Sequence, residues 1–401
     1  MENYKNKILF ILIGIVLIWY QFYRYVGFNP YSNVFTGISY LIFPFLLIYT
    51  SKEIFKKQNS LLMLFLLNTF ISMSMAMVVW GESLMSVFQA FHNYYLVMVF
   101  FLLAKMQAKE NEVERALIIL AIIYVACWLI QIWNVPELVF GVDRDDNLGD
   151  TEQRGFYRFF IPTKEHMPIL VLFMYEMFRR TKKLFYLVLC PICFAIVILH
   201  VGRQIMFWSF LSIVLLLLYQ NRKHWAKILV GSLVVYWLSL FFIEHIPTLN
   251  LLFDQTTTQV DNADDDIRLK CIEFYWHESI SNPLTFIFGN GLGVKDELWR
   301  FTQKAMAKGF YESDIGYFAL LFDFGLFGVL LYALLFVKIL RLKVEDKYLY
   351  LKFYLFYIYG CYTFAHTLTT NIFFNICAVY ILYMSNKKVV KNVALNNKKI
   401  I

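Results

Sequence analysis

Arginine side chains at the edges of apolar runs are the first residues in this sequence that could do chemistry. Arg203 lies in "LHVGRQIMFW", between the apolar stretches "FYLVLCPICFAIVI" and "SFLSIVLLLLY". A guanidinium ion is always charged and is costly to place at the centre of a bilayer. We therefore expect Arg203 at the edge of the membrane, where it could either reach lipid phosphate from a helix end or bind an anionic ligand.

Three more arginines are expected on the same side of the membrane. They are Arg154 and Arg158 in "EQRGFYRFF" and Arg268 in "DDDIRLK". Each guanidinium offers a planar fork of donors that matches phosphate, so together they favour a lipid-linked phosphate or pyrophosphate as ligand. Two simpler roles stay open: Arg268 could pair with Asp264 one turn earlier, and the other two could lie on a solvated loop face.

Two carboxylates stand where the chain re-enters the membrane, in "YESDIGYFALLFDFGLFG". A carboxylate at the mouth of a helical bundle can act as a general base. It can also cap the first turn of the following helix, where backbone N–H groups are free. Capping is the favoured role for Glu312, whereas the two roles weigh equally for Asp314.

The seven histidines show no spacing typical of metal ligands, and the sequence predicts no metal site and no cofactor. His277, expected on the outer side, is most simply an interfacial histidine. The acidic run "DNADDD" is expected to be a solvated helix start rather than a cation site.

The composition is typical of a polytopic all-α membrane protein. The 401 residues are 60% hydrophobic and only 16% charged, whereas about a quarter of the residues in a soluble domain are charged. Apolar runs of bilayer length recur along the whole chain. They predict a single bundle of about twelve transmembrane helices, at 8–26, 33–50, 60–80, 84–104, 115–134, 166–178, 184–201, 204–219, 228–245, 315–338, 348–367 and 371–385.

The net charge of +8 fits the positive-inside rule and does not indicate a nucleic-acid partner. Most Lys and Arg residues fall in one alternating set of turns, which predicts that both termini lie in the cytoplasm. The outer side then holds the loops 135–165 and 246–314. The second loop should contain short helices, including an amphipathic one with Ile267, Cys271, Phe274 and Glu278 on one face. Asn282-Pro283 should end that helix before the glycine turn "FGNGLG".

The order of these features resembles the O-antigen polymerase and O-antigen ligase superfamily of bacterial membrane glycosyltransferases. The matching features are "VGRQ" at a span junction, "RLKCIEFYWHESISNPLTFIFGNGLG" in the late outer loop, and the re-entry motif "DIGYFALLFDFGLFG". The match covers roughly residues 135–340. Ligase-like members begin the re-entry motif with His-Asn, and here Asp314 occupies the histidine position. The catalytic histidine of the ligases is therefore absent, which favours a polymerase.

The resemblance implies a metal-independent reaction between two polyprenyl-pyrophosphate-linked glycans. An acceptor sugar hydroxyl would attack the anomeric carbon of the donor, and polyprenyl pyrophosphate would leave. Arg203 and Arg268 would stabilise the leaving group, and Asp314 would act as base. The further substrate contacts expected are Arg154, Arg158, Glu312, Tyr275, Trp276, His277 and Tyr311.

Two alternatives follow from the same features. A ligase would transfer finished polymer to an acceptor, and a transporter would move lipid-linked sugars across the membrane. A transporter is expected to carry polar groups within broken membrane helices. Partners implied by the resemblance are a chain-length regulator and a flippase.

Overall fold

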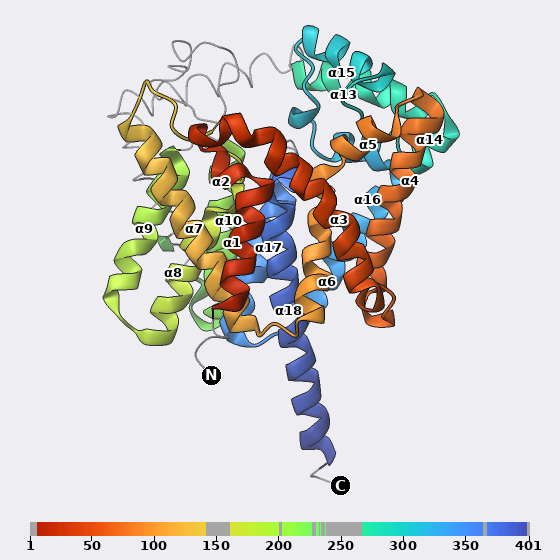
Figure 1. Cartoon of the computed structure of the whole chain (residues 1–401). Helices are drawn as coiled ribbons and strands as arrows, with labels where there is room; N and C mark the ends of the chain where they lie inside the picture. Colours follow the sequence, from red (N-terminus) through yellow and green to blue (C-terminus); the bar gives the residue numbers. More distant parts are fainter. Residues whose placement is uncertain are drawn as a thin grey trace.

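All the regular elements that the structure describes are helices (Figure 1). The structure is a computed structural model and describes residues 6–141, 161–199, 203–226, 267–363 and 367–398, with isolated residues between 230 and 237. The α-helices are α1 (Lys7–Trp19), α2 (Gln21–Arg24), α3 (Ser32–Ile54), α4 (Ser60–Trp80), α5 (Leu84–Ala90), α6 (Met98–Lys105), α7 (Glu110–Trp133), α8 (Pro168–Thr181), α9 (Leu184–Leu199), α10 (Arg203–Gln220), α13 (Ile267–Ile280), α14 (Pro283–Phe288), α15 (Glu297–Ala307), α16 (Tyr317–Arg341), α17 (Leu349–Cys361) and α18 (Thr367–Lys398).

The number of membrane spans is smaller than the sequence predicts. Within the described ranges, four helical stretches are long and apolar enough to cross a membrane: Val26–Ile54, Lys57–Trp80, Glu110–Trp133 and Tyr317–Arg341. A fifth is possible if α5 and the continuous stretch His92–Lys105, bent by 58°, form one span. The predicted count of twelve is therefore not supported. Helices such as α1 and α17 have 13 residues each, about 20 Å at 1.5 Å per residue, whereas a bilayer core is about 30 Å thick.

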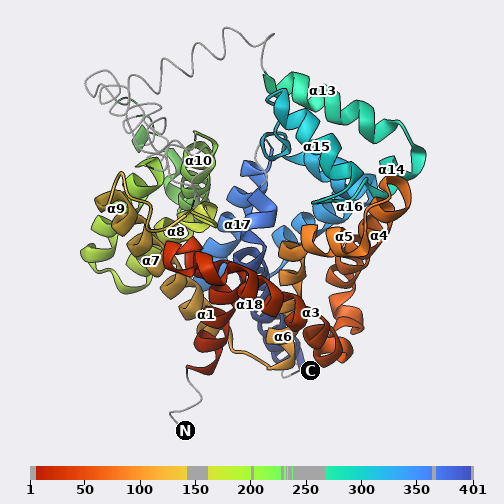
Figure 2. The ribbon, with the colours of Figure 1, turned by 45° about the horizontal axis from the view of Figure 1, so that its top comes forward.

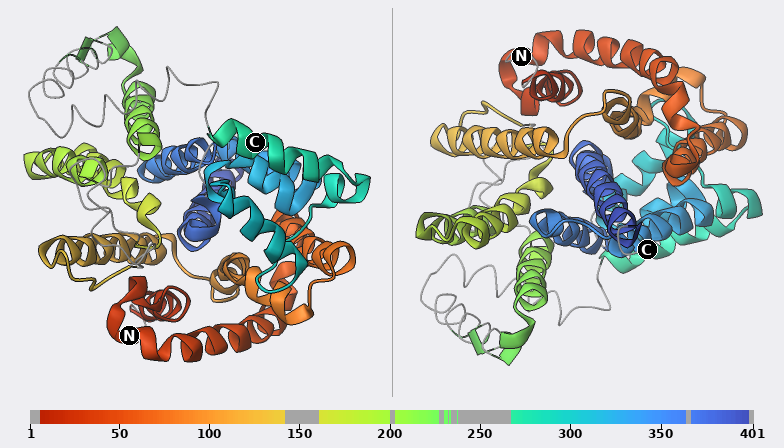
Figure 3. Two further views of the ribbon diagram at one scale, coloured as in Figure 1. Left: turned by 90° about the horizontal axis from the view of Figure 1, so that it is seen from above. Right: turned by 90° about the horizontal axis from the view of Figure 1, so that it is seen from below.

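Helices α17 and α18 lie at the centre of the bundle, surrounded by the other helices (Figure 3). Every residue from 371 to 382 in α18 is buried. The helix packs against α6, α7 and α17. A helix that is apolar all round is expected at such a place, because it has no face to offer to water. The last part of α18 leaves the bundle on the side where α1 begins (Figure 1).

Three short helices form a cap at the opposite end of the molecule (Figures 1 and 2). They are α13, α14 and α15, and they follow one another within the predicted loop 246–314. α13 and α14 pack on α16, while α14 and α15 pack on α4. The cap therefore covers one end of two candidate membrane spans.

The buried face of α13 differs by about one residue from the predicted one. Cys271, Tyr275 and Ser279 are buried, spaced four residues apart, whereas Ile267 is 50% exposed. The helix ends at Ile280, and Asn282 then caps α14 by accepting a hydrogen bond from the Leu284 N–H at 2.9 Å. The packing of α13 on α16, which the sequence alone does not reveal, selects this face.

Candidate functional site at a broken membrane helix

The candidate site lies where α16 is interrupted, in the half of the helix nearer its N-terminus. Gly325 has φ 67° and ψ −177°, so the helical path breaks there. The glycine turn after α14 lies against this break. Gly289 has φ 89°, and a Cβ on it would collide with the carbonyl oxygen of Asp323; a Cβ on Gly325 would collide with that of Ile287. Only glycine permits both the left-handed backbone and this close approach.

The turn supplies the hydrogen bonds that the broken helix lacks. The Asn290 N–H donates to the Phe322 carbonyl at 2.6 Å, and the Gly291 N–H donates to the Asp323 carbonyl at 3.0 Å. Ser72 Oγ of α4 also donates to the Asp323 carbonyl, at 2.5 Å. Backbone polar groups in a membrane must be satisfied within the protein. The glycines in "FGNGLG" and "FDFGLFG" therefore allow one contact, in which the glycine turn packs on the broken backbone of α16.

Asp323, six residues after the start of α16, is the most unusual side chain at this break. It is fully buried, and no nitrogen or hydroxyl donor among the described residues reaches either of its carboxyl oxygens. Glu312 lies in the one-turn helix η9 (Glu312–Asp314), is half-buried, and has its carboxyl within hydrogen-bonding reach of the Asp323 carboxyl. Two carboxylates cannot bond to each other, so a bond between them requires that one carries a proton.

Tyrosines enclose this pair from other elements. Tyr94, in the 3₁₀ helix η4 (His92–Val97), is 2% exposed and interacts electrostatically with both carboxyl groups. Tyr275 of α13 is fully buried and interacts with both as well. Neither phenol has a hydrogen-bond partner among the described residues. Tyr362, after α17, is a third neighbour. The site thus combines carboxyl and phenolic oxygens in an enclosed space.

Burial changes the acidity of Glu312, which lies outside the membrane-spanning segments. Loss of hydration raises the pKa of Glu312 to about 7, and the hydrogen bond with Asp323 partly opposes that rise. A carboxyl group with a pKa near neutral pH can both take up and release a proton under ordinary conditions.

The cap is attached to the bundle by a buried glutamate. Glu82, between α4 and α5, is 3% exposed. Its Oε1 accepts hydrogen bonds from the N–H groups of Leu298 at 2.9 Å and Trp299 at 3.4 Å, and its Oε2 accepts one from Ser86 Oγ. A carboxylate at the first N–H groups of α15 satisfies otherwise free donors and suits the helix dipole. Glu82 therefore holds α15 beside the candidate site.

The residues predicted from the sequence are only partly brought together. Arg154 and Arg158 lie outside the described residues, and Arg203 begins α10 with a side chain that is not described. Arg268 is half-buried on α13, the helix that also carries Tyr275. The predicted base Asp314 and three predicted substrate contacts, Trp276, His277 and Tyr311, have exposed side chains. Of the two carboxylates weighed in the sequence, Glu312 is the one that faces the buried aspartate.

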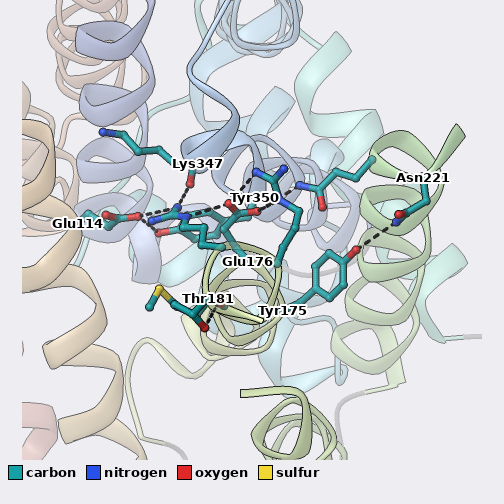
Figure 4. Close-up of polar contacts among 11 residues, drawn as sticks. Glu114, Tyr175, Glu176, Thr181, Asn221, Lys347 and Tyr350 are labelled. Atoms are coloured by element: carbon teal, nitrogen blue, oxygen red, sulfur yellow. Dashed lines mark hydrogen bonds and ion pairs between the residues drawn. The ribbon is translucent and has the colours of Figure 1, made fainter. Parts of the chain in front are cut away.

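A second polar cluster lies near the opposite end of the bundle (Figure 4). The fully buried Glu176 accepts hydrogen bonds from Arg179 at 3.0 and 2.9 Å, from Arg180 at 2.8 Å and from Gln220 at 3.2 Å. Tyr350 donates to Glu114 at 2.9 Å, and Arg180 approaches the same carboxylate at 3.7 Å. Every charge here has an opposite partner, so this cluster joins α7, α8, α10 and α17 rather than forming a reactive site.

An apolar cavity adjoins the site on the membrane side. It begins at Tyr94 and Leu320 and runs between α4, α16, α17 and α18 toward Leu335 and Ile339. A neighbouring cavity shares Leu335 and Ile339 and continues to Lys338.

In the part of the chain that the structure describes, no group of three or more His, Cys, Asp or Glu side chains could hold a metal ion.

Asp323 is the residue that sequence reasoning missed. The available signal was an ionisable residue within an apolar span, which marks a functional site by default.

No known protein family, curated protein or solved structure matches this chain.

Proposed function

We propose that this protein is a membrane glycosyltransferase that polymerises polyprenyl-pyrophosphate-linked oligosaccharide repeat units at the outer face of the bacterial cytoplasmic membrane. The observation that supports the proposal most is the Glu312–Asp323 pair, enclosed between a broken membrane helix and a helical cap. Glycosyl transfer to a hydroxyl group needs a base at the membrane surface, and the half-buried Glu312 has the acidity for it.

Other features agree with a lipid-linked sugar substrate. Trp276 and Tyr311 present aromatic faces on the cap, at 38% and 42% exposure, and Arg268 lies on the same helix as Trp276. The apolar cavity that begins at Tyr94 offers a surface for part of a hydrocarbon chain. In this proposal α13–α15 face outward, and the ends of α1 and α18 on the opposite side are cytoplasmic.

The test is deletion of the gene followed by complementation, with the surface glycan resolved on a gel. Deletion should leave a single repeat unit, and wild type should restore the ladder of longer chains. Glu312→Gln, Arg203→Ala and Arg268→Ala should fail to restore the ladder at a normal protein level. Asp314→Asn is compared with Glu312→Gln: the variant that abolishes the ladder identifies the base. Intact but unattached polymer after deletion would instead identify a ligase.

A transporter for lipid-linked sugars is the second candidate. The observation that favours it is the buried carboxyl group within a broken helix, which is typical of ion-coupled transport. Asp323 is only six residues from the start of α16, about 9 Å at 1.5 Å per residue, so it lies near one end of the span rather than at its middle. Accumulation of lipid-linked units inside the cell after deletion would identify a transporter.

A further inference from the structure

We propose that Glu312 and Asp323 form a proton-binding site that holds one proton between their two carboxyl groups. The two side chains are within hydrogen-bonding reach of each other. Asp323 is fully buried, with no other hydrogen-bond partner for its oxygens among the described residues. With no proton, the site would place two adjacent negative charges in a poorly hydrated space, which is strongly unfavourable. One proton removes a charge and supplies the donor that the geometry needs.

The groups that face the pair do not offer an alternative source of positive charge. The electrostatic neighbours identified from the described elements are the phenols of Tyr94 and Tyr275, the phenol of Tyr362, and the thiol of Cys271. The residues of α14, "PLTFIF", contain no titratable side chain. From α4, the Ser72 hydroxyl donates to the backbone carbonyl of Asp323 and carries no charge. None of these groups carries a positive charge, so within the part of the chain that the structure describes a bound proton is the cation that the pair needs.

The half-buried position of Glu312 gives the bound proton a route to water, whereas Asp323 has none of its own. Glu312 is therefore the group that exchanges protons with the outside. Asp323 is the positioning residue, since its hydrogen bond fixes the orientation of the Glu312 carboxyl. This division follows from their exposure and applies whichever reaction the protein performs.

The catalytic use of this site rests on the proposed function. The singly protonated pair has a net charge of −1 and can accept one more proton. As the acceptor oxygen bonds to the anomeric carbon of the donor, its proton moves to Glu312. The bond from that carbon to the pyrophosphate oxygen breaks, and its electron pair remains on the leaving polyprenyl pyrophosphate. Glu312 then returns the proton to water, and charge and atoms balance.

The test uses the purified full-length protein in lipid nanodiscs and infrared difference spectroscopy between acidic and alkaline buffer. A carbonyl stretch of a protonated carboxylic acid should persist at neutral pH in the wild type. Asp323→Asn should remove the band that persists above neutral pH, whereas Glu312→Gln should change its frequency, because a lone buried Asp323 keeps its proton but loses its carboxyl partner. Glu297→Gln, which alters an exposed carboxylate of the cap, should leave the band intact. Glu312→Asp keeps the carboxyl and should shift the midpoint of the titration, which provides a readout if Asp323→Asn does not fold.

Two results would overturn the proton site: a band unchanged in both pair variants, or a band lost on replacing choline with sodium, which would identify a metal-cation site. The spectroscopy needs no substrate, so the proton site and the proposed function can fail separately. A band that behaves as expected, in a protein whose deletion leaves the glycan ladder unchanged, would support the proton site and refute the polymerase.

Discussion

Gly325 and Gly81 have the same backbone φ, 67°, but different surroundings. A Cβ on Gly81 would meet no atom within 4 Å, whereas one on Gly325 would collide with backbone atoms of Ile287 and Gly289. We expect Gly81→Ala to cost about 1 kcal/mol from the left-handed backbone alone. Gly325→Ala should cost about 1–3 kcal/mol more, because its ψ of −177° suits glycine alone at that φ and because the added Cβ overpacks the contact with the glycine turn. The unfolding midpoints of the two purified variants measure this difference in stability. Equal losses of stability would contradict the tight contact between the glycine turn and α16.

The acidity of Glu312 predicts the pH dependence of the proposed reaction. Because burial raises its pKa to about 7, Glu312 is protonated below that pH and cannot accept the acceptor's proton. The rate should therefore rise as the pH increases through about 7 and then level off. The measurement is chain elongation by the protein in lipid vesicles with a lipid-linked repeat unit. Glu312→Asp should displace the rise, and an identical profile in that variant would exclude Glu312 as the base.

At the scale of the elements, the cluster around Glu176 predicts how the helices are held together. Glu176→Gln keeps the shape of the side chain but removes the charge that Arg179 and Arg180 share. Both arginines are 32% or less exposed, so we expect a loss of about 1–3 kcal/mol in the free energy of unfolding.

The matched control is Glu297→Gln, which breaks an exposed pair with Arg300 whose side chains are more than 60% exposed. It should cost less than about 0.5 kcal/mol. Thermal unfolding of both variants in the same detergent tests the comparison. Similar shifts would mean that the buried network adds no more stability than a surface pair.

At the scale of the whole molecule, the cap and the ends of α1 and α18 lie on opposite sides (Figure 1). In a cysteine-free background, a membrane-impermeant thiol reagent applied to intact cells should label Lys304→Cys on α15. It should label Lys391→Cys on α18 only after the membrane is opened, because both positions are exposed in the structure and the proposed topology places them in different compartments. The opposite pattern would place the cap in the cytoplasm and exclude a reaction at the outer face.

The class of the protein could be read from the sequence. Long apolar runs predict helices of bilayer length, and the described elements are all helical and include four stretches long and apolar enough to cross a membrane. The short helices of the late outer segment were also predictable, because α13 begins and ends close to its acidic start and its Asn-Pro stop. The number of spans was not predictable from the sequence. An apolar run predicts burial, but it does not distinguish a full membrane span from a shorter helix inside the bundle, such as α17.

The site was decided only by the tertiary structure. The sequence drew attention to Glu312 and Asp314 as neighbours, but their roles depend on which one faces Asp323, eleven residues after Glu312 in the chain. That choice depends on the break at Gly325 and on the turn from Gly289 to Gly291, which pairs with the broken backbone from a distant part of the sequence. Composition and periodicity describe the faces of single helices. A contact between a loop and a broken helix is a property of their packing, and it determines which carboxyl group is buried.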